Sequence, residues 1–422
     1  MTDLAEGGFG SLPDTWTIDT LGNTCQRPQY GYTASSTTSP IGPKFLRITD
    51  LEDNGTINWD TVPYCACDGD NLEKCRLQAG DLVFARIGAT TGKCSLLTKC
   101  PESVFASYLI RFRPEKVDAA FIYFFCQSDF YWRQVDAVKG EKLKGGISGS
   151  VLAAVKHVLP PSDEQRAIAA TLGSIQNAII HQGKIIASLK ELKTATMEHL
   201  FSCGVTHAET KDSAIGSIPS HWEVKRIDEI ADLVSGGTPS KSRPDWWKGS
   251  IPWASPKDMK VPRLHDAPDK ITQEAAEAGS RIVPAKTIFV VIRGMILIRD
   301  VPMAITEVPM AFNQDMKAIM AHDSVDPDFL FFAMQNRRSA LFQEISTSAH
   351  GTRRMGTSVI ESMQIALPKD KHEQMEIRDA IRQIDDQIAN KEQKRSSLQD
   401  LFASTLSAMM SGSLRTTPLL AG

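Results

Sequence analysis

Long apolar runs and an excess of basic charge are both missing from this sequence. No apolar run approaches the roughly 18 residues of a membrane-spanning helix. The first ten residues, Met1–Gly10, have neither the basic nor the apolar region of a secretory signal. We therefore expect a cytoplasmic protein without a membrane partner. The formal net charge of −3 excludes a protein that binds nucleic acid through a uniformly basic surface, so any DNA contact must come from local patches.

Cysteine is missing from the second half of the chain. The eight cysteines all lie in the first half and are Cys25, Cys65, Cys67, Cys75, Cys94, Cys100, Cys126 and Cys203. The cluster of Cys65, Cys67 and Cys75 suggests zinc, but its spacing is not the paired CxxC of zinc knuckles. The matching region of the second half has no counterpart. We therefore expect reduced cytosolic thiols and no metal site.

Motifs of common enzymes are absent as well. Segment 88–94 resembles a phosphate-binding loop, but it is one residue short and has Cys94 where Ser or Thr would hold Mg²⁺. Segment 159–162, Leu-Pro-Pro-Ser, lacks the amide and the aromatic ring of an adenine methyltransferase motif. No HExxH, GxSxG or GxGxxG occurs. The sequence thus points away from an enzyme and towards a recognition component that binds no cofactor itself.

The sequence does contain a long internal repeat. Trp16 and the Ser-Leu-Pro before it recur 206 residues later as Trp222 and Ser-Ile-Pro, and Glu164-Gln165 recurs 209 residues later as Glu373-Gln374. This period is too long for a solenoid and indicates two copies of one large unit. Two similar surfaces related by an approximate two-fold axis suit double-stranded DNA, which has the same kind of symmetry.

Each copy is predicted to contain a mixed domain followed by a long helix, which makes the fold class α+β. Strand-like runs at 82–85, 108–112 and 287–292 are bounded by Gly and Pro, and a short aromatic helix is expected over 119–133. The predicted boundaries are 1–161 for the first domain, 162–216 for a helical spacer and linker, 217–368 for the second domain and 369–422 for a second helical spacer.

The two long helices have a heptad pattern. Ser162 is a suitable N-cap with Gln165 three residues on, and apolar residues then recur at steps of four and three. The residues predicted to pack against the partner helix are Ile168, Leu172, Ile175, Ile179, Ile377, Ile381, Ile384 and Ile388. We expect an antiparallel coiled coil of 162–203 with 371–410. The alternative is two independent helices, each packed on its own domain.

Polar, glycine-containing loops are the candidates for DNA contact. Lys and Arg beside flexible glycines suit phosphates, whereas Asn, Gln and Arg can also read base edges. The loops around 142–146 and 350–354 occupy matching places in the two copies. The predicted DNA-binding residues are Tyr30, Tyr32, Thr33, Thr91, Lys93, Lys142, Lys144, Thr238, Lys257, Arg293, Asn313, Gln314, His350, Thr352, Arg353 and Arg354.

Over nearly its whole length the chain resembles the specificity subunit of type I restriction–modification systems. The resemblance is carried by the order of several short motifs across both copies. They are Leu12-Pro13 with Trp16, Ile218-Pro219 with Trp222, Gln29 to Thr33, Arg47 to Asp50, Gly80 to Val83, Ser235 to Pro239, Ile251 to Trp253, Lys257 to Met259 and a Pro followed closely by Glu-Gln at the start of each helix. The first copy has no clear Gly-Gly-Thr-Pro, and we align Leu21-Gly22-Asn23-Thr24 with it.

The resemblance implies two target-recognition domains, each reading half of a bipartite DNA site, with the helix pair setting the spacing. It also implies docking of methyltransferase subunits, two in number, that carry S-adenosylmethionine. Motor-nuclease subunits that use ATP and Mg²⁺ would join for restriction. Two other classes stay open: a self-contained DNA-modifying enzyme, and a coiled-coil scaffold without DNA binding.

Overall fold

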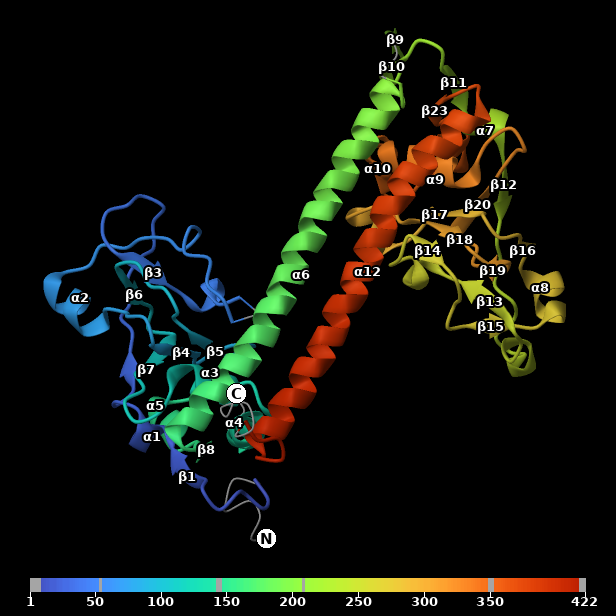
Figure 1. Cartoon of the computed structure of the whole chain (residues 1–422). Helices are drawn as coiled ribbons and strands as arrows, with labels where there is room; N and C mark the ends of the chain where they lie inside the picture. Colours follow the sequence, from blue (N-terminus) through green and yellow to red (C-terminus); the bar gives the residue numbers. More distant parts are fainter. Residues whose placement is uncertain (1–8, 53–54, 142–145, 207–208, 348–352, 417–422) are drawn as a thin grey trace. The chain divides into compact units, whose positions relative to one another are not determined.

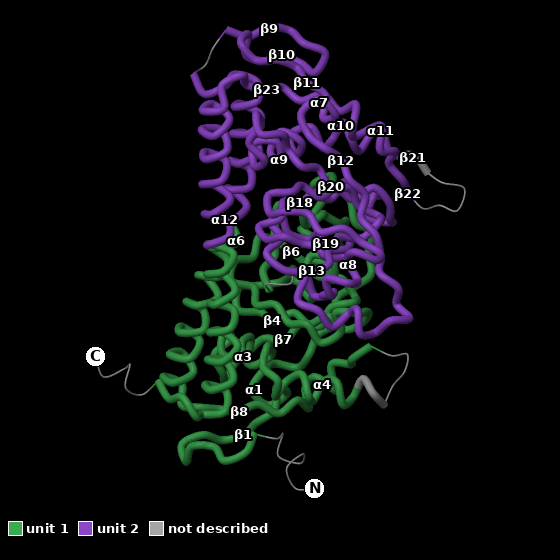
Figure 2. Tube along the Cα trace, turned by 90° about the vertical axis from the view of Figure 1, so that its right-hand side faces the viewer, with its two compact units in different colours: residues 1–185, 391–422 green, residues 186–390 purple. Residues whose placement is uncertain are grey.

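The computed structural model describes residues 9–416 apart from 53–54, 142–145, 207–208 and 348–352. The chain divides into two compact units (Figure 2). Unit 1 consists of residues 1–185 and 391–422, and unit 2 of residues 186–390. Each unit thus contains a mixed domain, the first part of one long helix and the last part of the other. The finer predicted boundaries at 161, 216 and 368 stay a prediction.

Unit 1 is built on an antiparallel sheet in the order β2-β7-β4-β5. All four residues of its central strand β4 are buried, as expected for a strand covered on both faces. The elements are β1 Thr17–Thr20, α1 Leu21–Thr24, β2 Gln29–Tyr30, β3 Lys44–Leu46, η1 Ile48–Asp50, α2 Gly69–Cys75, β4 Leu82–Ala85, β5 Cys94–Leu96, β6 Ser103–Phe105, β7 Leu109–Phe112, α3 Ala119–Phe125, α4 Asp129–Glu141, α5 Gly149–Ala153, β8 Lys156–Leu159 and the start of α6 Ser162–Cys203.

Unit 2 is built on a five-stranded sheet in the order β12-β20-β17-β18-β14. Its elements are β9 Thr210–Ser213, β10 Gly216–Pro219, β11 Glu223–Arg226, α7 Ile227–Ile230, β12 Ala231–Ser235, η2 Pro244–Trp247, β13 Ile251–Ala254, η3 Pro256–Asp258, β14 Arg263–Leu264, β15 Lys270–Ile271, α8 Gln273–Gly279, β16 Ile282–Val283, β17 Ile288–Val291, η4 Met295–Ile298, β18 Met303–Thr306, β19 Met310–Phe312, β20 Met316–Ala321, α9 Pro327–Asn336, α10 Arg338–Gln343, β21 Ser346–Thr347, β22 Arg353–Arg354, α11 Thr357–Glu361, β23 Gln364–Leu367 and α12 Lys371–Met410.

The two units share one strand pattern, so the internal repeat is confirmed. In unit 1, β4 pairs with β7 and β5, and in unit 2, β17 pairs with β20 and β18. A parallel pair recurs as β3 with β6 and β13 with β19, and an antiparallel pair as β1 with β8 and β11 with β23. The strands predicted at 82–85, 108–112 and 287–292 are β4, β7 and β17.

Identical hydrogen bonds fix the start of each long helix. The Trp16 indole donates to Glu164 at 2.9 Å in unit 1, and the Trp222 indole donates to Glu373 at 3.1 Å in unit 2. The next residue of each helix is a glutamine, and its side chain accepts from the backbone N–H of the N-cap of the aromatic helix that precedes it, α3 or α9. These pairs are Asp118 with Gln165 and Asp326 with Gln374, both at 2.8 Å. The repeated Glu-Gln pair therefore has a structural role: in each unit it attaches the start of the long helix to the mixed domain that precedes it.

The helices α6 and α12 are antiparallel. Buried Leu172 near the start of α6 and Leu406 near the end of α12 belong to the core of unit 1. Phe201 near the end of α6 and Ile377 near the start of α12 belong to the core of unit 2. Stretches of the two helices lie side by side (Figures 1 and 2). The alternative of independent helices is excluded, because each helix ends in the core of the other copy's domain.

The predicted packing stripe on these helices is partly buried. Ile168, Leu172, Ile377 and Ile381 are fully buried, and Ile388 is 8% exposed. The remaining three, Ile175, Ile179 and Ile384, are intermediate. Among the described residues no helix is both long and apolar enough to cross a membrane.

The end of the spacer and linker predicted over 162–216 contains β9, which pairs with β10 in a hairpin, and Gly216 adopts φ +107° there. One local prediction is wrong. The expected aromatic helix over 119–133 is two helices, α3 and α4. Ser128 lies between them and its hydroxyl donates to the Phe125 carbonyl at 2.7 Å, a local bond that competes with helix continuation.

Candidate nucleic-acid interface

A close backbone approach fixes the same loop in both units. A Cβ at Gly31, after β2, would lie 2.2 Å from the Phe105 carbonyl oxygen. A Cβ at Gly236, after β12, would lie 2.3 Å from the Phe312 carbonyl oxygen. The N–H of the residue after each glycine donates to that same carbonyl. Only glycine fits at these two positions, which are therefore equivalent.

This equivalence corrects one alignment made from the sequence. Leu21-Gly22-Asn23-Thr24 was placed opposite Gly236-Gly237-Thr238-Pro239, but it forms helix α1. The counterpart of α1 is α7, which lies before the loop at Gly236. Helix α1 follows β1, which pairs with β8, and helix α7 follows β11, which pairs with β23. Both helices precede the sheet of their unit, so the motif that matches Gly236 is Gly31 and its neighbours.

Threonines beside these glycines connect two loops in each unit. In unit 1 the Thr33 hydroxyl donates to Ser107 at 3.1 Å. In unit 2 the Thr238 hydroxyl donates to the Gln314 side-chain oxygen and accepts from Asn313 at 3.3 Å. Gln314 is exposed and Asn313 is half-buried. The structure therefore brings three predicted residues together, and their amides have the chemistry that reads base edges.

An aromatic pocket of about 680 Å³ adjoins this loop in unit 2. Trp247 and Trp253 meet edge to face with ring centroids 5.1 Å apart, and the Trp253 indole donates to the Gly237 carbonyl at 3.0 Å. Lys257 lines the same pocket and its ammonium lies 2.7 Å from Asp269, whose hydrogen bond raises the pKa of Lys257. Neither tryptophan was among the predicted DNA-binding residues, although Trp253 ends the motif that begins at Ile251 and Trp247 lies in the Trp246-Trp247-Lys248 run, which was the signal for it.

Three predicted arginines of unit 2 lie on adjacent backbone. Arg293 forms a backbone bridge with Arg354, and β22, which holds Arg353 and Arg354, pairs with β21. The Arg293 guanidinium is 49% exposed and lies 3.7 Å from Asp315. Arg354 is exposed and Arg353 is half-buried. Arginines on adjacent backbone supply the cationic groups that bind the phosphates of a nucleic-acid backbone.

The predicted tyrosines of unit 1 have structural contacts. The Tyr30 hydroxyl accepts from the Gly149 N–H at 2.7 Å, and the Arg86 guanidinium stacks over the Tyr30 ring at 5.0 Å. The Tyr32 hydroxyl lies 2.9 Å from the Cys65 sulfur. Desolvation and this thiol raise the pKa of Tyr32. Tyr30 remains 41% exposed, and Arg86 beside it is a cation that the sequence reasoning did not select.

Thr91 and Lys93 face inward. Thr91 is 7% exposed and donates to the Gly88 carbonyl at 2.7 Å, and the Lys93 ammonium donates to the Leu51 carbonyl at 2.9 Å. Their segment is a turn, as its sequence indicated, with Gly88 and Gly92 at positive φ. The geometry adds no support for a DNA contact by either residue.

Four predicted residues, Lys142, Lys144, His350 and Thr352, lie outside the described residues. The segments that contain them are followed by equivalent hydrogen bonds. The Ile147 N–H donates to the Arg86 carbonyl at 2.8 Å, and the Met355 N–H donates to the Ile292 carbonyl at 2.9 Å. Ile147 and Met355 therefore lie at matching places beside the two sheets.

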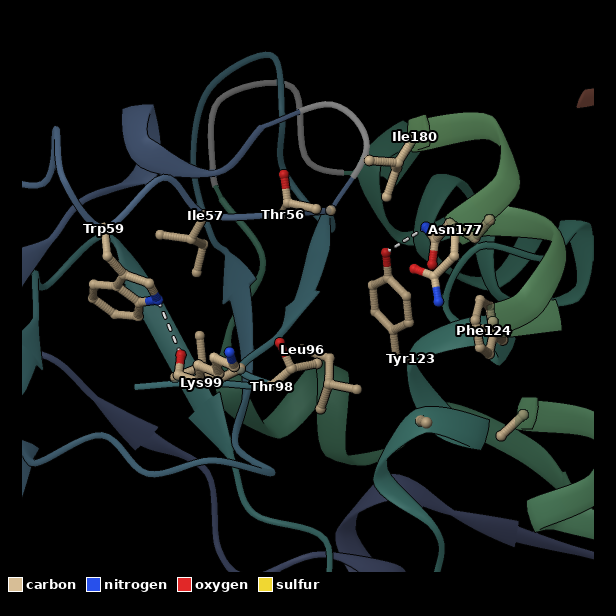
Figure 3. Close-up of a pocket in the computed structure, with 16 residues that line it drawn as sticks. Thr56, Ile57, Trp59, Leu96, Thr98, Lys99, Tyr123, Phe124, Asn177 and Ile180 are labelled. Atoms are coloured by element: carbon tan, nitrogen blue, oxygen red, sulfur yellow. Dashed lines mark hydrogen bonds between the residues drawn. The ribbon is translucent and has the colours of Figure 1, made fainter. Parts of the chain in front are cut away.

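A separate pocket of about 410 Å³ in unit 1 lies between the domain and α6 (Figure 3). The Tyr123 hydroxyl points towards α6 and accepts from Gln176 at 2.9 Å, and the Trp59 indole donates to the Lys99 carbonyl at 3.0 Å. None of the predicted DNA-binding residues lines this pocket.

The cysteines do not gather into a metal centre in the part of the chain that the structure describes, where no group of three or more His, Cys, Asp or Glu could hold an ion. Cys65 and Cys75 are buried and reduced. Burial raises the pKa of both thiols, which disfavours the thiolate form that binds metal.

Comparisons with known proteins agree with this geometry. The model of the type I restriction modification DNA specificity domain matches the chain twice, at residues 42–191 and 219–400. The chain is 32% identical to a type I restriction enzyme specificity subunit of Escherichia coli over 166 residues, 39% of this chain and 41% of that protein. It is 23% identical to the putative MjaX specificity subunit of Methanocaldococcus jannaschii, with 96% of this chain and 95% of that protein covered.

The matches to the Escherichia coli subunit and to the MjaIX specificity subunit of Methanocaldococcus jannaschii span less than half of those proteins, 41% and 44%. Among solved structures, the S subunit of a type I restriction–modification system from M. genitalium is similar with a TM-score of 0.63 and 14% identity, over 95% of this chain and 98% of that one. At 14% identity this similarity shows a shared fold and nothing more. With two matches that together cover most of its length, the chain belongs to the family of type I restriction modification DNA specificity domains.

Proposed function

We propose that this chain is the sequence-specific DNA-recognition subunit of a type I restriction–modification complex, and that each unit reads one half of a bipartite site. The observation that carries the proposal is the repeated loop at Gly31 and Gly236, held in both units by the same carbonyl contact. Beside it, each unit presents hydrogen-bonding side chains at Thr33 and Thr238. Two equivalent polar surfaces are what a two-part duplex site requires.

In unit 2, Thr238, Asn313 and Gln314 are the proposed base-reading group, because amides and hydroxyls match the donor and acceptor pattern of base edges. Lys257, Arg293, Arg353 and Arg354 would bind phosphates, together with His350 and Thr352. In unit 1 the proposed contacts are Tyr30, Tyr32, Thr33, Lys142 and Lys144, without the inward-facing Thr91 and Lys93.

We also propose that the chain has no catalytic activity of its own and docks methyltransferase subunits, two in number, that bind S-adenosylmethionine. Motor-nuclease subunits with ATP and Mg²⁺ would complete the restriction complex. The relatives named above are specificity subunits, which supports this division of labour. Methylation of DNA by the pure polypeptide would instead favour a self-contained enzyme.

The decisive experiment exchanges one domain. Residues 217–368 are replaced by the equivalent domain of a relative, and the methylated sequence is read from the genome of cells that carry the chimera with its methyltransferase partner. One half of the recognised site should change while the other is retained. A change in both halves or in neither would contradict modular reading. A wild-type chain with no sequence-dependent retention on duplex DNA would favour a scaffold.

A further inference from the structure

Unit 2 exposes a cluster of large apolar side chains on the loop between β17 and β18. Met295 is 64% exposed, Ile296 42% and Ile298 46%, all on the single-turn helix η4. Their neighbour Leu297 is 1% exposed and belongs to the core of unit 2. Single exposed apolar residues are ordinary, but a contiguous cluster on one turn marks a contact surface.

The fold itself does not require this cluster. The corresponding turn of unit 1 also starts with a glycine at positive φ, Gly88 at +79° where unit 2 has Gly294 at +142°. Its buried anchor is Thr91 at 7% exposure, in the place of Leu297. The exposed residues of that turn are the small Ala89 and Thr90. The apolar side chains of η4 are therefore a feature of unit 2 alone among the described turns.

Basic residues lie next to η4 along the backbone and in an adjoining pocket. The Gly294 N–H donates to the Arg353 carbonyl at 3.2 Å, and Arg293 forms a backbone bridge with Arg354. An adjoining pocket of about 660 Å³ is lined by Met295 and Ile296 together with the cations Lys257, Lys260 and Arg338 and one carboxylate, Asp300, which pairs with Arg338. Exposed apolar side chains bordered by cations match a ligand with negative charges on its outside and apolar surfaces within. Duplex DNA has phosphates outside and stacked bases within.

The conformation of η4 is fixed in the free chain. Leu297 is buried, and the N–H groups of Leu297 and Arg299 donate to the carbonyls of Gly294 and Ile296 at 3.2 and 3.0 Å. The Asp300 carboxylate accepts from the Val301 N–H at 2.8 Å where the turn ends. A pre-ordered apolar turn loses little conformational entropy on binding.

We propose that Met295, Ile296 and Ile298 form an apolar wedge that enters duplex DNA at one base step of the half-site bound by unit 2 and unstacks it. This inference rests on the proposed DNA recognition. Met and Ile are among the side chains that proteins insert between base pairs, and the flanking arginines would hold the phosphates of the opened step. Because Ala89 and Thr90 stand at the corresponding turn, the half-site of unit 1 would remain stacked.

The test uses the full chain assembled with its methyltransferase partner and a duplex of the recognised sequence, identified first from genomic methylation. The fluorescent base 2-aminopurine is placed at successive steps of both half-sites. Fluorescence should rise on binding at one step of the half-site of unit 2, and at none in the other half-site. Met295→Ser with Ile296→Ser should abolish the rise and weaken binding about tenfold, without changing the salt dependence, since no charge is lost. Ile41→Ser, at a residue 61% exposed in unit 1, is the matched control.

The outcomes separate the wedge from the proposed function. If the wild-type complex does not bind its methylated sequence specifically, DNA recognition by this chain fails. If it binds specifically but fluorescence stays flat at every step, the wedge is wrong and recognition stands. If the double variant binds DNA normally but loses its methyltransferase subunits on gel filtration, η4 contacts protein, which overturns the wedge.

Discussion

Arg415, beyond the end of α12, forms a salt bridge with Glu164 in the first turn of α6, with Nε 2.5 Å from Oε1. Glu164 is 5% exposed and also accepts the indole hydrogen bond of Trp16. One buried carboxylate therefore joins three distant parts of unit 1. In unit 2 the equivalent Glu373 binds Trp222 and His221.

Replacement of Glu164 by Gln should destabilise unit 1. The charge that holds Arg415 disappears while the side-chain volume is kept, and hydrogen bonds to charged groups contribute about 1.5–3 kcal/mol. We expect the free energy of unfolding, measured by urea titration, to fall by about 1–2 kcal/mol. Glu102→Gln is the control, because its pair with Arg76 is exposed and such pairs contribute about 0–1 kcal/mol. Equal losses in the two variants would contradict the role of Glu164.

Gly236→Ala should damage the loop that carries Thr238. The new Cβ would lie 2.3 Å from the Phe312 carbonyl oxygen, so the backbone of the loop must shift. We expect a loss of about 1–3 kcal/mol in unfolding free energy and weaker binding to the half-site of unit 2. Gly69→Ala is the control, because nothing lies within 4 Å of its Cβ position. Thermal unfolding that leaves both variants at the wild-type midpoint would show that the loop tolerates the change.

His157 should make stability fall in mild acid. It is fully buried, with Nε2 2.9 Å from the Thr24 hydroxyl, and burial lowers its pKa. The unfolded chain takes up a proton below the ordinary value of about 6.5 while the folded chain does not. Stability is therefore lost as the pH falls below about 6.5, by up to about 1.4 kcal/mol per pH unit from this group.

Urea titrations of wild type and His157→Gln at pH 7.5 and 5.5 measure this contribution. The difference between the two pH values should be smaller in the variant, whatever its absolute stability. His265→Gln, at an exposed position, should keep the wild-type difference. A His157 variant with unchanged pH dependence would mean that the buried imidazole is protonated in the folded state.

Arg353→Ala with Arg354→Ala should reduce the salt dependence of DNA binding. Each phosphate contact contributes about 0.9 to the slope of log affinity against log salt concentration. The double variant should therefore lose about one to two from that slope, measured by fluorescence anisotropy between 50 and 200 mM salt. Lys225→Ala with Lys369→Ala removes the same charge beside Glu223 and should leave the slope unaltered. An unchanged slope in the arginine variant would remove β22 from the interface.

Four residues inserted after Gln182 of α6, with a matched insertion after Lys391 of α12, should lengthen the spacer of the recognised site. Four residues are close to one turn and add roughly 6 Å, so the buried stripe keeps its direction. Since DNA rises about 3.4 Å per base pair, the spacer should grow by one or two base pairs. Two residues at each place would rotate the stripe by about 200° and prevent assembly. A genomic methylation pattern with the original spacer would show that the helices do not set the spacing.

The long helices were predictable because local and periodic signals coincide. The structure begins α6 at Ser162, which was predicted as the N-cap and is the first residue of the helix, and it begins α12 at Lys371. The loops were harder. Gly22 and Gly31 each precede a threonine by two residues, but only the contact with the Phe105 carbonyl shows that Gly31 is the counterpart of Gly236. Such a contact is made by residues far apart in the chain, which no local pattern contains.

Exposure was the least predictable property of the site. Lys93 looks like a phosphate ligand in sequence, yet its ammonium is bound to the Leu51 carbonyl. Met295 to Ile298 look like core, yet only Leu297 is buried. The direction of a side chain in a short turn depends on where that turn meets the sheet. Hydropathy alone therefore assigns such residues to the wrong side.

The division of the chain into units has a consequence for synthesis on the ribosome. Unit 2 is complete once Asn390 has been made, whereas unit 1 still needs residues 391–422. The domain translated first is therefore the last to close, and until then the apolar surface that receives Leu406 and Met409 stays uncovered. Chaperones would bind the nascent chain in this state.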